Sequence, residues 1–351
     1  MAAYTTIDNP ELYFQADLYT GNGSNDHAQT FDGDENMQPD MVWIKSRSDA
    51  ENHHIFDSVR GANARLLANT TGAEFDDSSN LQSFDSDGFT LGTADGINKN
   101  TATFVCWGWK ANGSGSANTD GSINTTATSA NTTAGFSIIE WSGSAAAATI
   151  GHGLGAVPKM IICKDTSDTY NWGVYHHKNT SAPETDYLYL NTTAATADSD
   201  SVWNDTAPTS TLFSVKNAGA TNASGTNNMI AYCFSDVQGY SKFGSYTGNG
   251  NANGVFVYTG FRPAFLMVKK SSGTSAWYIY DNKRAGYNPD NNQLYPDRNN
   301  AEDTTDQVDF LSNGFKWQGI TGDPNGSATY VYMAIAEAPL VNSEGVPCNA
   351  R

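Results

Sequence analysis

The chain has 351 residues, and its 19 lysines and arginines against 37 aspartates and glutamates give a formal charge of −18 at pH 7. This charge repels phosphate backbones, so nonspecific nucleic-acid binding is not expected. Aromatic residues make up 12% of the chain, a share too high for a disordered protein. No apolar run approaches the ~20 residues that cross a bilayer, and the first residues lack the basic and apolar regions of a signal peptide. We therefore expect neither membrane insertion nor secretion.

The four cysteines are scattered through the chain without a CxxC pair, which argues against a zinc ribbon or a disulfide scaffold. Cys106, Cys163 and Cys233 lie in apolar runs and are expected to be buried free thiols. The chain is instead rich in Asn, Thr, Ser, Gly and Ala, which suit strands and tight turns better than long amphipathic helices.

An ordered series of motifs starts after residues 1–17, which we interpret as an N-terminal docking arm. The series comprises a Gly-rich turn, a proline-led strand that is apolar on both faces and closed by lysine, an aromatic strand, a Gly-Phe turn and a final apolar strand. In chain order these are Tyr19-Thr-Gly-Asn-Gly23, Pro39-Asp-Met-Val-Trp-Ile-Lys45, His54-Ile-Phe-Asp57, Asp87-Gly-Phe-Thr-Leu91 and Thr103-Phe-Val-Cys-Trp-Gly-Trp-Lys110. Short strands divided by such turns are typical of antiparallel sandwiches. They predict a first β-sandwich over residues 18–111.

The same series recurs twice more, which is the strongest organisational signal in the sequence. The proline-led strand returns as Pro158-Lys-Met-Ile-Ile-Cys-Lys164 and as Pro263-Ala-Phe-Leu-Met-Val-Lys269. These copies predict sandwiches over residues 136–238 and 239–339. Residues 112–135 have the Gly, Ser, Asn and Thr composition of a flexible linker, and residues 340–351 form a predicted C-terminal arm.

The fold class predicted from this organisation is all-β. It consists of three tandem small antiparallel β-sandwiches, lectin-like or jelly-roll-like, for which a pseudo-threefold arrangement is one way of packing.

No catalytic motif was found: the chain lacks GxSxG, P-loop, post-strand GxGxxG and HExxH patterns. His53-His54 and His176-His177 are adjacent pairs, and neighbouring residues on a strand point to opposite faces, so neither pair can chelate one ion with both rings. We do not expect an enzyme, and no cofactor is expected apart from a candidate structural calcium ion.

Acidic loops are the candidates for that ion, because Ca²⁺ prefers hard oxygen ligands. Asp85 and Asp87 lie two residues apart in one loop, and Asp32 and Asp34 do so in another. The alternative is an ordinary structural turn, which Asp87-Gly88 would also form.

Aromatic residues among Asn, Asp and Gly are the candidates for ligand binding, because flat rings edged by polar groups are what sugar-binding surfaces use. They are Trp109, Trp172, Trp203, Trp277, Tyr287 and Tyr295. For each of them the alternative is packing in the core or between copies.

Basic residues follow the aromatic strand at matching places: Arg60 in the first copy, Lys283-Arg284 in the third and Lys178 in the middle one. In so acidic a chain we expect them to pair with nearby carboxylates rather than to form an anion site.

The Tyr-Thr-Gly-Asn-Gly, Pro-Asp-Met-Val-Trp-Ile-Lys and Phe-Asp-Ser-Asp-Gly-Phe motifs together resemble a repeat of virion proteins from tailed bacteriophages, especially marine ones. Gly151-His-Gly-Leu-Gly-Ala-Val-Pro-Lys-Met-Ile-Ile162 and Ala336-Glu-Ala-Pro-Leu340 are similar to segments of phage tail-fibre and appendage proteins. The resemblance runs from about Tyr19 to Pro339. The middle copy departs from it, because it lacks the Asp-Gly-Phe turn and the Arg-Gly pair.

The resemblance implies a structural virion protein, assembled in the host cytoplasm, with no catalytic residues to carry over. The function expected from it is that of a tail fibre or appendage contributing to host attachment, a lectin-like receptor-binding role directed at surface glycans. The alternative is a capsid decoration or adaptor with a purely structural role. The expected partners are other virion proteins, further copies of this chain in a homo-oligomer, and a host surface glycan.

Overall fold

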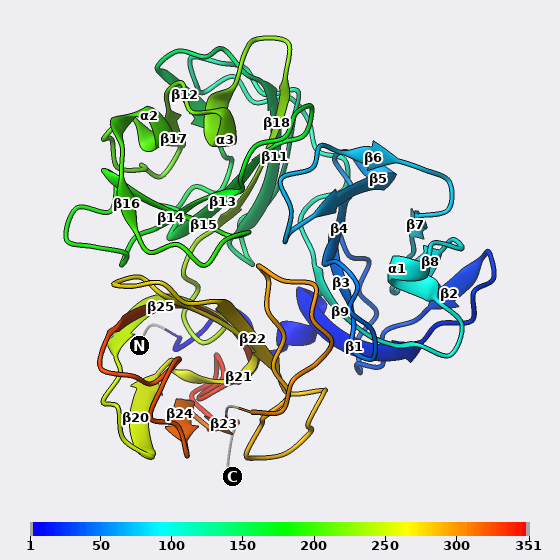
Figure 1. Ribbon diagram of the computed structural model, residues 1–351, viewed down its shortest axis with the longest axis vertical. Helices are drawn as coiled ribbons and strands as arrows, with labels where there is room; N and C mark the ends of the chain where they lie inside the picture. Colours follow the sequence, from blue (N-terminus) through cyan, green and yellow to red (C-terminus); the bar gives the residue numbers. More distant parts are fainter. Residues whose placement is uncertain (1–2, 306, 349–351) are drawn as a thin grey trace.

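Strands dominate the described part of the chain, which comprises residues 3–305 and 307–348 of a computed structural model (Figure 1). The helices of these residues are short: η1 (Pro10–Leu12), α1 (Asp95–Asn98), α2 (Asp200–Trp203) and α3 (Gly219–Asn222). The strands pair antiparallel within several small sheets, and the ribbon forms three lobes around a common centre. The predicted all-β sandwich class is confirmed.

Unit 1 is the lobe that contains β1 to β9. Its main sheet has the order β1-β9-β3-β4-β5-β6, and a smaller sheet has the order β2-β8-β7. The strands are β1 (Phe14–Thr20), β2 (His27–Gln29), β3 (Met41–Ser46), β4 (His54–Asp57), β5 (Gly61–Leu67), β6 (Phe75–Asp76), β7 (Leu81–Phe84), β8 (Phe89–Leu91) and β9 (Thr103–Trp109).

Unit 2 contains β10 to β18. Its main sheet has the order β10-β11-β18-β13-β14-β15-β16, and β12 pairs with β17 in a smaller sheet. The strands are β10 (Ala127–Asn131), β11 (Phe136–Ser142), β12 (Ala148–Gly151), β13 (Met160–Asp165), β14 (Gly173–His176), β15 (Asp186–Tyr189), β16 (Ala197–Asp198), β17 (Leu212–Val215) and β18 (Asn228–Phe234).

Unit 3 contains β19 to β25. Its main sheet has the order β19-β25-β21-β22, and a smaller sheet has the order β20-β24-β23. The strands are β19 (Ser241–Thr247), β20 (Asn253–Tyr258), β21 (Phe261–Lys270), β22 (Trp277–Asp281), β23 (Gln307–Leu311), β24 (Gly314–Gln318) and β25 (Thr329–Pro339). The series β1-β9-β3-β4, β11-β18-β13-β14 and β19-β25-β21-β22 follow one connection pattern.

The proline-led strand lies inside the main sheet of every unit, as β3, β13 and β21. All residues of β3 and β13 are buried, which explains why both faces of these strands are apolar. Pro39 and Pro158 precede their strands, whereas Pro263 lies at an irregularity in the pairing of β21 with β25. Proline has no N–H to donate to a ladder. It is tolerated at the start of a strand or at an irregularity in the pairing, because no regular ladder hydrogen bond is needed there.

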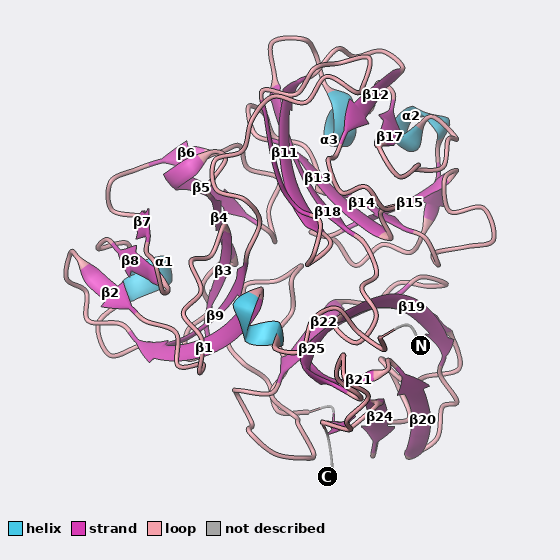
Figure 2. Ribbon diagram, turned by 180° about the vertical axis from the view of Figure 1, so that it is seen from behind, coloured by secondary structure: helices cyan, strands magenta, loops and turns pink. Residues whose placement is uncertain are grey.

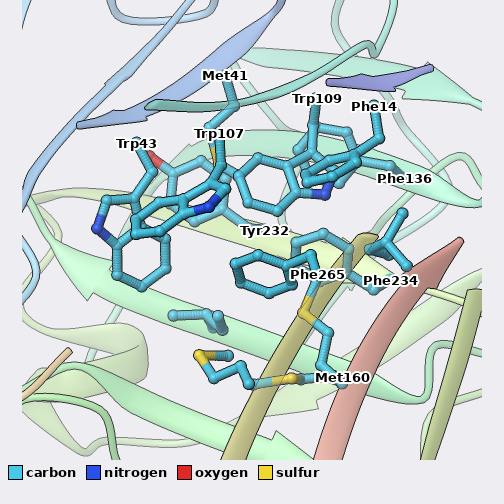
Figure 3. Close-up of a cluster of buried hydrophobic side chains, with 14 of the residues drawn as sticks. Phe14, Met41, Trp43, Trp107, Trp109, Phe136, Met160, Tyr232, Phe234 and Phe265 are labelled. Atoms are coloured by element: carbon cyan, nitrogen blue, oxygen red, sulfur yellow. The ribbon is translucent and has the colours of Figure 1, made fainter. Parts of the chain in front are cut away.

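Each unit has its own core between its two sheets, and the opposite faces of the three main sheets meet in one shared cluster, which we call the central cluster (Figure 3). The register of the two inner strands identifies four sets of equivalent residues there. They are Met41, Met160 and Phe265; Trp43, Ile162 and Met267; Trp107, Tyr232 and Met333; and Trp109, Phe234 and Ile335. The space left among them is only about 10 Å³.

Polar contacts at the ends of β4, β14 and β22 join the three units in a ring. Tyr232 of unit 2 donates a hydrogen bond to Asp57 of unit 1 at 2.7 Å. Trp107 of unit 1 donates to Asp281 of unit 3 at 3.0 Å. The Nε2 atom of His176, in unit 2, lies 3.1 Å from the carbonyl oxygen of Tyr332 in unit 3. The three interfaces therefore use equivalent positions on one side, Asp57, His176 and Asp281, whereas on the other side Tyr332 is the neighbour of Met333, the equivalent of Trp107 and Tyr232.

Residues 112–135, predicted to be a flexible linker, contain β10, which extends the main sheet of unit 2 by pairing with β11. Ser116 and Thr128 exchange backbone hydrogen bonds of 3.2 and 2.8 Å, and Asn112 N–H donates to the hydroxyl of Ser129. Part of the predicted linker is thus a paired strand, because it finds partners at the free edge of β11, which its composition does not indicate.

The predicted terminal arms also pack on the body where they are described. Ile7 and Phe14 are buried in the central cluster, and β1 begins at Phe14, four residues before the predicted start of the first sandwich. Ser343 N–H donates to Asp8 at 2.6 Å, so the two arms contact each other. The ends of both arms, residues 1–2 and 349–351, lie outside the described residues. Figure 2 shows the same three lobes from behind. The short helix η1 contacts β1 and β25.

Candidate functional site

A pocket of about 410 Å³ opens beside the junction of units 2 and 3. It is formed by the N-terminal segment, the connection between β18 and β19, and the turn between β20 and β21. Its lining residues are Tyr4, Asp236, Gln238, Gly239, Ser241, Lys242, Tyr258, Thr259 and Gly260.

Tyr258, the last residue of β20, supplies the aromatic face of the pocket and is 48% exposed. Lys242 Nζ lies 5.2 Å from the centre of this ring and donates a hydrogen bond to the Tyr258 carbonyl at 2.9 Å. Phe256, two residues earlier on the same strand, is 46% exposed. Alternate residues of a strand share a face, so β20 presents two aromatic rings to solvent.

Tyr4 closes the other side of the pocket. Its hydroxyl donates to the Gly260 carbonyl at 2.8 Å and lies 3.4 Å from the Tyr258 hydroxyl. Burial, followed by the neighbouring Tyr258, raises the pKa of Tyr4 well above its ordinary value, so this hydroxyl stays neutral. Gly260 has φ +88°, and a Cβ there would lie 2.8 Å from the Tyr4 hydroxyl. Glycine is therefore needed for the chain to turn this close to Tyr4.

Exposed polar groups complete the pocket. Asp236 accepts a hydrogen bond from Phe243 N–H at 2.9 Å, which orients its carboxylate, and Gln238 is exposed beside it. A pocket with one exposed ring, a carboxylate, an amide and an ammonium group can stack on a sugar ring and orient its hydroxyls.

Five of the six aromatic residues predicted to bind a ligand are buried, so the prediction of exposed rings is wrong for them. Their exposed fractions run from 0 to 7%: Trp109, Trp172, Trp203, Trp277 and Tyr295. Tyr287 is 80% exposed, but it lies in a different loop from the pocket described above.

The buried tryptophans instead hold the units together or fill their cores, as the alternative had allowed. Trp172 of unit 2 donates to the Leu67 carbonyl of unit 1 at 3.0 Å, and Trp277 of unit 3 donates to the Tyr189 carbonyl of unit 2 at 2.9 Å. In the central cluster, the ring centres of Trp109 and Phe265 are 5.5 Å apart.

The two remaining buried candidates have their side chains inside single units. In the core of unit 2, the ring centres of Trp203 and Tyr175 are 6.0 Å apart. Tyr295 donates its hydroxyl to Asp303 at 2.9 Å.

Of the four candidate calcium ligands, three carboxylates have other partners, and Asp34 is bonded through its backbone. Asp85 accepts hydrogen bonds from Ser83 and Thr90, both at 2.7 Å, and Asp87 accepts one from Met37 N–H. Asp32 forms an ion pair with Lys283 at 2.6 Å. Asp34 N–H donates to Glu11 at 2.9 Å. Among the described residues, no group of three or more His, Cys, Asp or Glu side chains is arranged to hold a metal ion.

Comparison with protein families gives one result, a match of residues 9–339 to the model of a domain of unknown function, DUF7483. The chain belongs to the DUF7483 family. No curated protein and no solved structure matches the chain. Tyr4 lies outside the matched range, so the DUF7483 domain supplies all of the pocket except this side chain.

The pocket of this DUF7483 chain was not predicted from the sequence. The segment Val255-Phe-Val-Tyr258 is apolar at every position, so its pattern does not tell which residues face solvent. Tyr4 and Asp236 come from segments that are distant in sequence, and only the packing of the N-terminal segment brings them together.

Proposed function

We propose that this protein is a structural component of a tailed-phage virion and contributes to recognition of glycans on the host surface. The observation that supports glycan binding is the pocket at Tyr258, where a half-exposed ring lies among Lys242, Asp236 and Gln238. The phage assignment rests on the resemblance of the repeated motifs to virion proteins.

Replacing Tyr258 with alanine tests this proposal. The ring is half exposed, so its removal should leave the fold intact while lowering glycan binding about tenfold, equivalent to ~1.4 kcal/mol. Binding would be measured on a glycan array and by adsorption of purified protein to host cells. Phe75→Ala is the matched control, because Phe75 is an equally exposed ring (50%) on unit 1.

Equal binding by Tyr258→Ala and the unaltered protein would reject the pocket as the glycan site. If the unaltered protein binds no glycan and no host cell, the recognition role itself is rejected.

A second candidate is a capsid decoration or adaptor protein. The observation that favours it is the ring of three similar units around a common core, which gives the body a pseudo-threefold outline suited to a threefold site on a particle. A reconstruction of the intact virion distinguishes the two roles, because a position on the head would exclude a tail fibre.

A further inference from the structure

Unit 2 lacks the buried ion pair that units 1 and 3 have at the turn after β4 and β22. Arg60 Nε lies 2.7 Å from Asp57 Oδ2, and Arg284 Nε lies 2.6 Å from Asp281 Oδ2. Both arginine side chains are almost fully buried and reach a further carboxylate, Glu74 or Glu302. In unit 2, His176 stands at the position of the aspartate and Asn179 at the position of the arginine. Asn179 is shorter than arginine, and the two residues form no ion pair.

An open cavity of about 630 Å³ lies at this place, between units 2 and 3. Its size is in the range of small-molecule sites. Unit 2 contributes the residues Lys178, Asn179, Thr180, Ala195 and Thr196, and unit 3 contributes Ser245, Ser271, Ser272 and Thr329.

The cavity presents a cation without a counter-charge. Lys178 is exposed and forms no ion pair within 4 Å with any described residue, whereas Lys283, at the same position in unit 3, pairs with Asp32 at 2.6 Å. Of the described residues that line the cavity, none carries a carboxylate. The chain as a whole carries a formal charge of −18, but the local charge at this cavity is positive. The Lys178 ammonium group therefore attracts anions to it.

A buried amide at the cavity wall lacks a hydrogen-bond acceptor. Asn179 is 4% exposed, and its Oδ1 accepts a hydrogen bond from Thr196 Oγ1 at 2.6 Å. Its Nδ2 has no partner among the described residues. Buried amide donors are normally satisfied, so an acceptor is missing here. Asn179 lines the cavity, but its Nδ2 atom is covered, so donation to a ligand requires the amide to turn towards the cavity.

We infer that this cavity binds a small acidic polyol, a ligand of monosaccharide size with one carboxylate and several hydroxyls. The carboxylate lies against Lys178 Nζ and accepts from Asn179 Nδ2, and the serine and threonine hydroxyls bind the ligand hydroxyls. This site is separate from the pocket at Tyr258, which offers an aromatic ring and a carboxylate instead. The inference does not depend on the proposed function.

Titration of the full-length protein with glucuronate, followed by calorimetry or ligand-observed NMR, tests the inference. Glucose, which has the same ring without the carboxylate, should bind at least tenfold more weakly. Lys178→Gln should weaken glucuronate binding about tenfold, and the matched variant Lys283→Gln should leave it unchanged. Acetate, which lacks the hydroxyls, should compete poorly.

A second variant tests whether Lys178→Gln loses glucuronate binding through the cavity itself or through a change elsewhere in the fold. The double change His176→Asp and Asn179→Arg installs the pair of the other two units, and the arginine should fill the cavity and abolish glucuronate binding, with the folded state checked by its circular dichroism. Absence of measurable glucuronate binding, equal binding of glucose, equal competition by acetate, or an equal loss in Lys283→Gln would each overturn the inference. A Tyr258→Ala protein that still binds glucuronate would separate this site from the proposed glycan pocket.

Discussion

The lysine that ends each proline-led strand is buried in all three units. Lys45, Lys164 and Lys269 are each 0% exposed, and each ammonium donates to backbone carbonyls of the following turn, for example Lys45 Nζ to Ser46 O at 2.6 Å. Burial is the main cause that lowers the pKa of each to about 8. Lysine is rarely buried, so from the sequence these residues are expected only to end their strands. The sequence does not reveal that their ammonium groups hold the following turns by hydrogen bonds.

His176 makes the stability of the interface between units 2 and 3 depend on pH. Its Nδ1 accepts from Lys178 N–H and its Nε2 donates to the Tyr332 carbonyl, an arrangement that requires the neutral ring. Burial, followed by smaller effects that include His177 and Lys178, lowers the pKa of His176 to about 3. The ordinary value is ~6.5, so between pH 6.5 and pH 3 the unfolded chain binds a proton that the folded chain does not.

We therefore expect His176 to destabilise the folded state as the pH falls from 6.5 towards 3, by ~1.4 kcal/mol per pH unit. His176→Gln keeps a donor for the Tyr332 carbonyl but does not titrate. Urea unfolding at pH 7 and pH 5 should show a smaller loss of unfolding free energy for this variant than for the unaltered protein. His27→Gln, at a half-buried position in unit 1, is the control. Equal losses in both variants and the unaltered protein would contradict the assignment.

At the scale of elements, the sequence predicts those strands whose burial leaves a clear pattern. The proline-led strands are continuous apolar runs, and β3, β13 and β21 lie inside their sheets as expected. Edge elements escape prediction, because an edge strand such as β10 is selected by the partner it finds and not by its own composition. The exposed rings of β20 escape for a related reason, since both faces of this strand are apolar in sequence.

Hydrogen exchange tests the order of β10. The amide of Thr126 donates to the Glu140 carbonyl at 2.7 Å and that of Thr128 to Ser116 at 2.8 Å, so a peptide covering residues 126–131 should exchange slowly. The exposed loop at residues 155–157, whose amides donate to no described residue, serves as the reference for rapid exchange. Exchange of both segments at the same rate would restore the interpretation as a flexible linker.

At the scale of the whole molecule, the central cluster couples the three units, because each contributes a face of its main sheet to it. The ring centre of Phe265, in unit 3, lies 5.7 Å from that of Trp107 and 5.5 Å from that of Trp109, both in unit 1. The presence of this cluster follows from strands that are apolar on both faces. Which tryptophans enter it cannot be read from the sequence, since Trp172 and Trp203 both adjoin asparagine in polar loops, yet Trp172 enters the central cluster and Trp203 lies in the separate core of unit 2.

Phe265→Ala should therefore destabilise unit 1 as well as unit 3. Loss of a buried phenylalanine costs ~3–5 kcal/mol, and the amides of β3 in unit 1 should exchange faster. Phe213→Ala removes a ring from the separate core of unit 2 and should leave β3 less affected. Unchanged exchange of β3 in Phe265→Ala would show that the units unfold independently.

The four sets of equivalent residues in the central cluster differ in size from unit to unit. Unit 1 supplies tryptophan in three of them, where unit 3 supplies Met267, Met333 and Ile335, but in the fourth set unit 1 supplies Met41 and unit 3 supplies Phe265. Three identical copies of unit 1 would crowd the middle with tryptophans, and three copies of unit 3 would leave it underfilled. Having all three units on one polypeptide allows them to complement one another in volume, so none could be exchanged for another without repacking the remaining two.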